Sequence, residues 1–142
     1  MRRVGWLLLM LPVFVGCESS AGGSSVKCVG PYLDDQPPGR AHAAPAPTVS
    51  PGDTLVIHGH RYTSTCNDTG GDESPDPLVP LAPVRLTVTL PGGAVLRTGP
   101  FAPGGQDMGF AASVRIPART PAGMALVRDE QRHTYRFAVG SS

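Results

Sequence analysis

The stretch VRLTVTL at residues 84–90, followed by the turn PGG at 91–93, decides the fold class of this chain. Every second side chain in the stretch is apolar, so a β-strand would place all of them on one face. These positions are Val84, Leu86, Val88 and Leu90. The turn leads into AVLR at residues 94–97, which has the composition of a second strand. The stretch therefore predicts a β-hairpin with one buried face.

Two further segments repeat this alternation. Residues 54–60 (TLVIHGH) follow a Ser-Pro-Gly-Asp turn, and residues 110–116 (FAASVRI) end at Pro117. The positions expected to face the core are Leu55, Ile57 and Gly59 in the first segment and Phe110, Ala112, Val114 and Ile116 in the second. His58 and His60 would then lie on the outer face, where we expect both to be exposed to solvent.

The C-terminal segments 124–128 and 134–139 predict a final hairpin, with Tyr135, Phe137 and Val139 on one face. A helix is the alternative, because 124–139 contains neither glycine nor proline, but its C-terminal half fits the strand period better than the helical one. Strands do not alternate with helices, which argues against a parallel α/β sheet. Six to seven short strands separated by turn residues predict an all-β protein with an antiparallel sandwich.

The N-terminus has the organisation of an export signal. Arg2 and Arg3 precede an apolar run at 4–15 that is too short for the roughly 20 residues of a membrane-spanning helix. The run ends in Phe14-Val15-Gly16-Cys17, which resembles the lipobox of bacterial lipoproteins. The resemblance implies removal of residues 1–16, acylation of Cys17 with palmitate or a similar chain, and an extracytoplasmic protein anchored to the cell membrane. Plain secretion with an incidental cysteine is the alternative.

Under this interpretation, residues 17–27 hold the lipidated cysteine and a flexible Gly/Ser tether, and residues 28–142 form a single domain with one modest core. Loss of the two leader arginines leaves ten basic residues against eleven acidic ones. Nucleic acid is therefore not an expected partner, because phosphate binding requires concentrated positive charge.

Several turn and strand motifs then follow one another in a set order. They are Pro-Gly-Asp before residues 54–59, Cys66-Asn67-Asp68-Thr69, the alternating hairpin, and Val114-Arg115-Ile116-Pro117 with Pro121-Ala122-Gly123 before the last two strands. This order resembles that of the Ig-like β-sandwich domains of bacterial cell-surface lipoproteins, over residues 45–140. The resemblance implies an Ig-like fold and transfers no functional residue, because that fold is a scaffold for many functions.

Cys28 and Cys66 form an even pair in a chain expected to be exported. We predict a disulfide between them, which would stabilise the fold by roughly 4 kcal/mol in the chain-entropy description. A metal-binding or redox-active thiol pair is the alternative, but it would require closer spacing, such as Cys-x-x-Cys.

Three histidines are candidates for a metal site. His58 and His60 would lie about 6 to 7 Å apart on one strand face, and His133 precedes the last strand. Three imidazoles can bind zinc or copper, and Met108 and Met124 would add soft ligands for copper. We favour solvent-facing histidines, because local spacing fixes no third ligand.

Four carboxylates, Asp68, Asp72, Glu73 and Asp76, crowd one segment that also holds two adjacent glycines. Oxygen-rich loops of this kind bind calcium, but the spacing does not match an EF-hand. We favour a hydrated acidic loop and keep weak calcium binding as the alternative.

The sequence contains no Gly-x-Ser-x-Gly, no His-Glu-x-x-His and no phosphate-binding loop. We therefore expect a protein that is not an enzyme and needs no cofactor. The leading hypothesis is a lipid-anchored interaction or structural module of the cell envelope. Its expected partners are membrane lipid, which it contacts through acylated Cys17, and an unidentified envelope or extracellular protein. An extracytoplasmic copper or zinc carrier is the second hypothesis, and an uncharacterised enzyme is the third.

Overall fold

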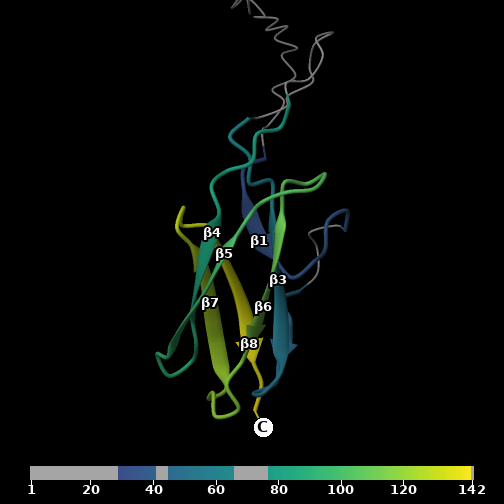
Figure 1. The fold of residues 1–142 in the computed structure, drawn as a ribbon. Coiled ribbons are helices and arrows are strands. Elements are labelled where there is room, and N and C mark those ends of the chain that lie inside the picture. The colour runs from purple at the N-terminus through teal and green to yellow at the C-terminus, as the bar shows by residue number, and fades with distance from the viewer. Residues whose placement is uncertain (1–28, 41–44, 66–76, 142) are drawn as a thin grey trace, which may run out of the picture.

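A computed structural model describes residues 29–40, 45–65 and 77–141. This part of the chain is all-β, with two sheets packed face to face as a sandwich (Figure 1). The three-stranded sheet has the order β1 (Tyr32–Asp34), β3 (Thr54–His60), β6 (Phe110–Arg115). The five-stranded sheet has the order β2 (Thr48–Val49), β8 (Thr134–Val139), β7 (Gly123–Asp129), β4 (Val84–Thr89), β5 (Val95–Phe101).

Both predicted hairpins are present as antiparallel pairs, β4 with β5 and β7 with β8. The first turn is closed by Gly93 N–H, which donates to Leu90 O at 3.0 Å. Gly92 and Gly93 there have φ of 85° and 88°, a region that glycine enters without steric cost. In the C-terminal segment, the pairing of β7 with β8 shows that strands form there and not the alternative helix.

The predicted core positions are correct. β3, β4, β6, β7 and β8 alternate as expected, and their side chains between the sheets are almost completely buried, whereas β5 at the sheet edge has no buried residue. Fully buried examples are Ile57, Leu86, Val88, Ala112, Val127 and Phe137, all with 0% exposure. Phe110 and Tyr135 face the same core but are only partly buried at its rim.

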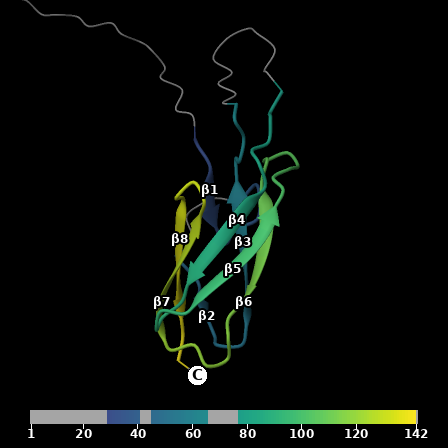
Figure 2. The ribbon, with the colours of Figure 1, turned by 60° about the vertical axis from the view of Figure 1, so that its left-hand side comes forward.

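Two details differ from the expectation. The described residues form eight strands and not six to seven. The sequence did not predict β1 and β2, because these strands of three and two residues in a Pro-rich interval are too short to show a period. In addition, β2 pairs with β8 in parallel, so the sandwich is not purely antiparallel. β1 pairs with the C-terminal half of β3, with Tyr32 opposite His60. Figures 1 and 2 both show β1 entering at the end of the sandwich opposite to the C-terminus.

Candidate functional site

His60 is buried, with 3% exposure, so the expectation that it faces solvent is wrong. Its predicted position on the outer side of β3 is correct, since Ile57 and Gly59 face the core. The burial arises because β1 pairs along the edge of β3, with Tyr32 opposite His60, and because the β5–β6 loop lies against the end of β3. The ring of Tyr32 stacks on the imidazole with 4.6 Å between ring centroids and 15° between the planes.

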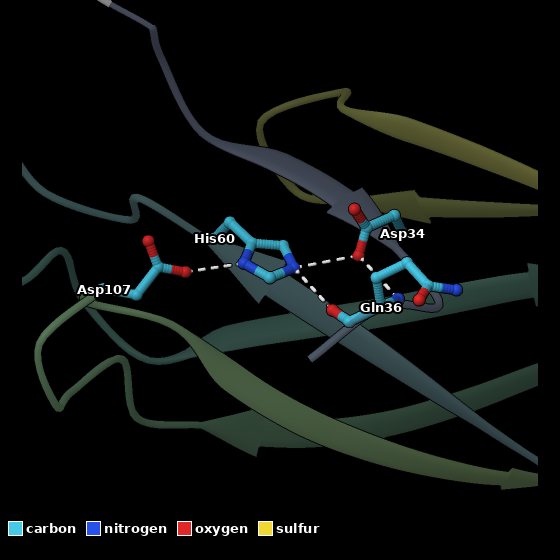
Figure 3. Close-up of polar contacts among 4 residues, drawn as sticks. All are labelled: Asp34, Gln36, His60 and Asp107. Carbon is cyan, nitrogen blue, oxygen red and sulfur yellow. Dashed lines mark hydrogen bonds and ion pairs between the residues drawn. The ribbon is translucent and has the colours of Figure 1, made fainter. Parts of the chain in front are cut away.

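His60 lies between two carboxylates, in a group that we call the His60 cluster: Asp34, Gln36, His60 and Asp107 (Figure 3). Its Nε2 is 2.8 Å from Asp34 Oδ1 and 3.1 Å from the carbonyl oxygen of Gln36. Its Nδ1 is 2.5 Å from Asp107 Oδ2. Both nitrogens of the ring are therefore occupied.

Local backbone geometry presents the two carboxylates to the ring. Asp34 ends β1, and its Oδ1 also accepts a hydrogen bond from Gln36 N–H at 2.9 Å, which turns the Gln36 carbonyl toward His60. Asp107 lies in the loop between β5 and β6. This loop is held against the end of β3, because Arg61 N–H donates to Asp107 O and Tyr62 N–H donates to Met108 O, each at 2.9 Å.

The hydrogen-bond partners of His60 are acceptors on both sides of the ring. Nε2 donates to Asp34 Oδ1 and to the Gln36 carbonyl oxygen. Nδ1 and Asp107 Oδ2 share a hydrogen bond. The His60 cluster thus fastens β1, β3 and the β5–β6 loop together.

His58 is half-buried on the same side of β3, with 6.2 Å between its ring centroid and that of His60. Burial lowers the pKa of His58 below its ordinary value, and the neighbouring His60 lowers it further. Asp34 and Asp35 act in the opposite direction. His58 is accordingly less readily protonated than an exposed histidine.

A second group of polar side chains joins the two sheets, and we call Tyr62, Asp129 and His133 the Asp129 cluster. The Tyr62 hydroxyl donates to Asp129 Oδ2 at 2.7 Å. His133 N–H donates to Asp129 Oδ1 at 2.8 Å, and His133 Nδ1 lies 2.7 Å from Asp129 Oδ2. Burial, and then the hydrogen bond to Asp129, raise the pKa of the Tyr62 hydroxyl above its ordinary value.

The three candidate histidines do not form one site. His58 and His60 are neighbours, whereas His133 contacts Tyr62 and Asp129 at the β7–β8 turn. Across residues 29–40, 45–65 and 77–141, no group of three or more His, Cys, Asp or Glu side chains is placed to hold a metal ion. Met124 is 59% exposed on the outer face of the five-stranded sheet, and Met108 lies in the β5–β6 loop.

Other candidates lie outside the described residues: Cys17, Cys28 and Cys66, and the four carboxylates Asp68, Asp72, Glu73 and Asp76. Lipidation, the disulfide and calcium binding therefore stay predictions. The described ranges contain no helix that is long and apolar enough to cross a membrane. The chain matches no protein-family model, no curated protein and no solved structure.

Sequence reasoning missed the partners of both histidines. Asp34 and Asp107 come from a short strand and a loop that lie 26 and 47 residues from His60, and no local pattern joins them to it. Asp129 carried one readable signal: it continues the inward alternation of residues 125 and 127, which places a carboxylate in the core. A buried carboxylate requires donors, and Tyr62 and His133 supply them.

Proposed function

We propose that this chain is a non-enzymatic, lipid-anchored module of the cell envelope, built on an Ig-like sandwich and held to the membrane through acylated Cys17. The observation that carries the proposal is that the buried polar side chains connect parts of the fold to one another. Asp34, His60 and Asp107 fasten the entering strand to the sandwich, and Tyr62 and Asp129 fasten the two sheets together. Their polar atoms act in folding, and the outer surface is left for interaction.

The strand order supports the Ig-like assignment. In chain order, the sheets β1-β3-β6 and β2-β8-β7-β4-β5 correspond to strands A-B-E and A′-G-F-C-C′ of Ig-type sandwiches. The parallel pair of β2 with β8 fits a first strand that changes from one sheet to the other. The sequence departs from antibody domains, because β3 and β7 contain no cysteine and β4 contains no tryptophan.

The anchor is tested by Cys17→Ser. We expect the variant to leave the membrane fraction and to appear in the medium or periplasm, because the acyl chains supply the membrane affinity. Metabolic labelling with a palmitate analogue provides the matched readout, present in the parent chain and lost in the variant. A variant that remains membrane-bound would contradict lipid anchoring.

Titration with copper and zinc separates the module from the metal carrier. A site of three imidazoles binds these ions with micromolar or tighter affinity. We expect no such binding, because both ring nitrogens of His60 and Nδ1 of His133 already have partners. Micromolar binding that is lost in His58→Ala would favour the carrier.

A further inference from the structure

The outer face of the five-stranded sheet has an unusual distribution of charge. Its strands β4, β5, β7 and β8 carry one exposed arginine each, which together we call the arginine face: Arg85, Arg97, Arg128 and Arg136. The same strands carry one carboxylate, Asp129, whose side chain points inward to Tyr62. Within the part of the chain that the structure describes, none of the four arginines forms an ion pair.

The register brings these charges close together. Thr87 pairs with Arg97 on one side and with Arg128 on the other, so the two arginines lie in one row, about 10 Å apart across two strand spacings. Arg85 lies two residues along β4 from Thr87, on the same face. Arg85, Thr87 and Arg97 line a shallow hollow of about 310 Å³, and Glu130 also lines it.

A break in the β4–β5 ladder shapes this hollow. The register shifts between Val84 and Leu86, so that two residues of β5 lie opposite Arg85. One of them is Gly99, with φ of 108°, and a Cβ there would lie 2.7 Å from the carbonyl oxygen of Val84. Bulges of this kind redirect side chains at sheet edges. Like charges at these spacings repel, so an external anion would stabilise the face.

Two exposed apolar side chains lie on the same side of the sheet as the arginine face. Val95 and Met124 are 52% and 59% exposed, and they lie on the same side of the sheet as Arg97 and Arg128. Val95 is two residues, or about 7 Å, from Arg97 along β5. A bilayer surface offers both phosphate groups for the guanidinium ions and an apolar layer just below them, whereas a soluble polyanion offers only the charge.

The face also lies within reach of the predicted anchor. The bond between Tyr62 and Asp129 places the end of β7, with Arg128, at the same end of the sandwich as the end of β3. The described chain enters at this end, where Tyr32 pairs with His60 (Figures 1 and 2). Residues 18–25 have the composition of a Gly/Ser linker, and a flexible linker of eight residues has a root-mean-square reach of about 15 Å.

We propose that the arginine face binds anionic phospholipid headgroups and holds the domain flat against the membrane that carries it. The proposal rests on the proposed function for the anchor that tethers the domain to that membrane. Guanidinium groups bind phosphate oxygens in bidentate geometry, and each arginine near an anionic surface strengthens the contact by about fivefold. Tethering makes the contact intramolecular, so weak individual contacts suffice.

The test uses the full chain in vesicles, with benzoylphenylalanine, a photoreactive residue, in place of Thr89 or of Ser113. Thr89 is exposed on the outer face of β4, and Ser113 is exposed on the outer face of β6 in the other sheet. We expect the photoreactive residue at position 89 to crosslink to phosphatidylglycerol. The crosslinking yield should fall at least about fivefold when the vesicles contain only phosphatidylcholine, and crosslinking should be lost at high salt. Ser113 should react weakly with either lipid.

Paired variants identify the groups responsible. Arg97→Gln with Arg128→Gln should weaken the phosphatidylglycerol contact by about 25-fold, whereas Arg97→Lys with Arg128→Lys should retain most of it. The matched control is Arg115→Gln with Arg119→Gln, which removes the same charge from exposed positions outside the arginine face and should change nothing. All forms should keep the unfolding midpoint of the parent chain, because these side chains are exposed.

Equal reaction at Thr89 and Ser113 would overturn the proposal, and so would reaction of Thr89 in intact cells with a protein or with a second copy of this chain in place of lipid. The anchor is tested separately. Crosslinking at position 89 in vesicles tests the arginine face whether the chain is attached by an acyl group or by its apolar leader. A failure of Cys17→Ser to release the protein would therefore not change the interpretation of that crosslinking.

Discussion

The His60 cluster and the Asp129 cluster lie at the same end of the sandwich, but the first places an imidazole between two carboxylates and the second places a carboxylate between donors. In the second, the Tyr62 hydroxyl, the His133 backbone N–H and the His133 ring all contact the one carboxylate of Asp129. The comparison separates two tasks: Asp129 joins the sheets to each other, and His60 joins the entering strand to them.

Reduction of the predicted disulfide should have the largest effect on the free energy of unfolding. It also tests whether the His60 cluster alone holds β1. Cys28 precedes Tyr32 by four residues and Cys66 follows His60 by six, and Tyr32 pairs with His60. We expect reduction, or Cys28→Ser, to lower the free energy of unfolding by roughly 4 kcal/mol in urea. Free thiols in the native, oxidised protein would show that the bridge does not exist.

Asp129→Ala should have the next largest effect. The Asp129 side chain is 0% exposed, and its removal leaves the buried Tyr62 hydroxyl without its acceptor. We expect a loss of about 3 kcal/mol, the scale of breaking a buried, charged hydrogen-bond group. The matched control is the neighbouring, exposed Glu130→Ala, which should change the free energy of unfolding by less than about 0.5 kcal/mol. Equal effects would mean that Asp129 does not join the sheets.

His60→Ala should cost about 2 kcal/mol, because it leaves the buried Asp34 carboxylate without an imidazole donor. His58→Ala, two residues away on the same strand, should cost about 0.5 kcal/mol or less. Hydrogen exchange of the β1 amides that pair with β3 would show the loss directly, since β1 is the strand that His60 fastens. If the two alanine variants were equally stable, the His60 cluster would not differ from an ordinary outer strand face.

The contrast also shows which parts of the structure a sequence can predict. Alternation in residues 54–60, 84–90, 110–116 and 134–139 predicted the strands, their core faces and both hairpins, because burial of every second side chain is a local property. The burial of His60 depends on β1, a three-residue strand with no visible period. Asp34 and Asp107 reach His60 only after the chain has folded, so the exposure of an outer position could not be read from its own strand.

The pH dependence of His58 should be the smallest effect and the finest test of the comparison. Burial, and then the adjacent His60, hold the pKa of His58 below its ordinary value of 6.5. The unfolded chain therefore binds a proton at His58 more readily than the native protein does. The stability that comes from an uncharged His58 is fully present above pH 6.5 and is lost as the pH falls through that value toward the lowered pKa. Because the ring is only partly buried, water screens much of this effect.

His58→Gln should flatten the decline in the free energy of unfolding between pH 7.5 and pH 5, measured in urea against the parent chain, since it removes the titrating ring and leaves His60 in place. A variant with the same decline as the parent would mean that the pH dependence arises elsewhere and that His58 does not sense the charge on the His60 cluster.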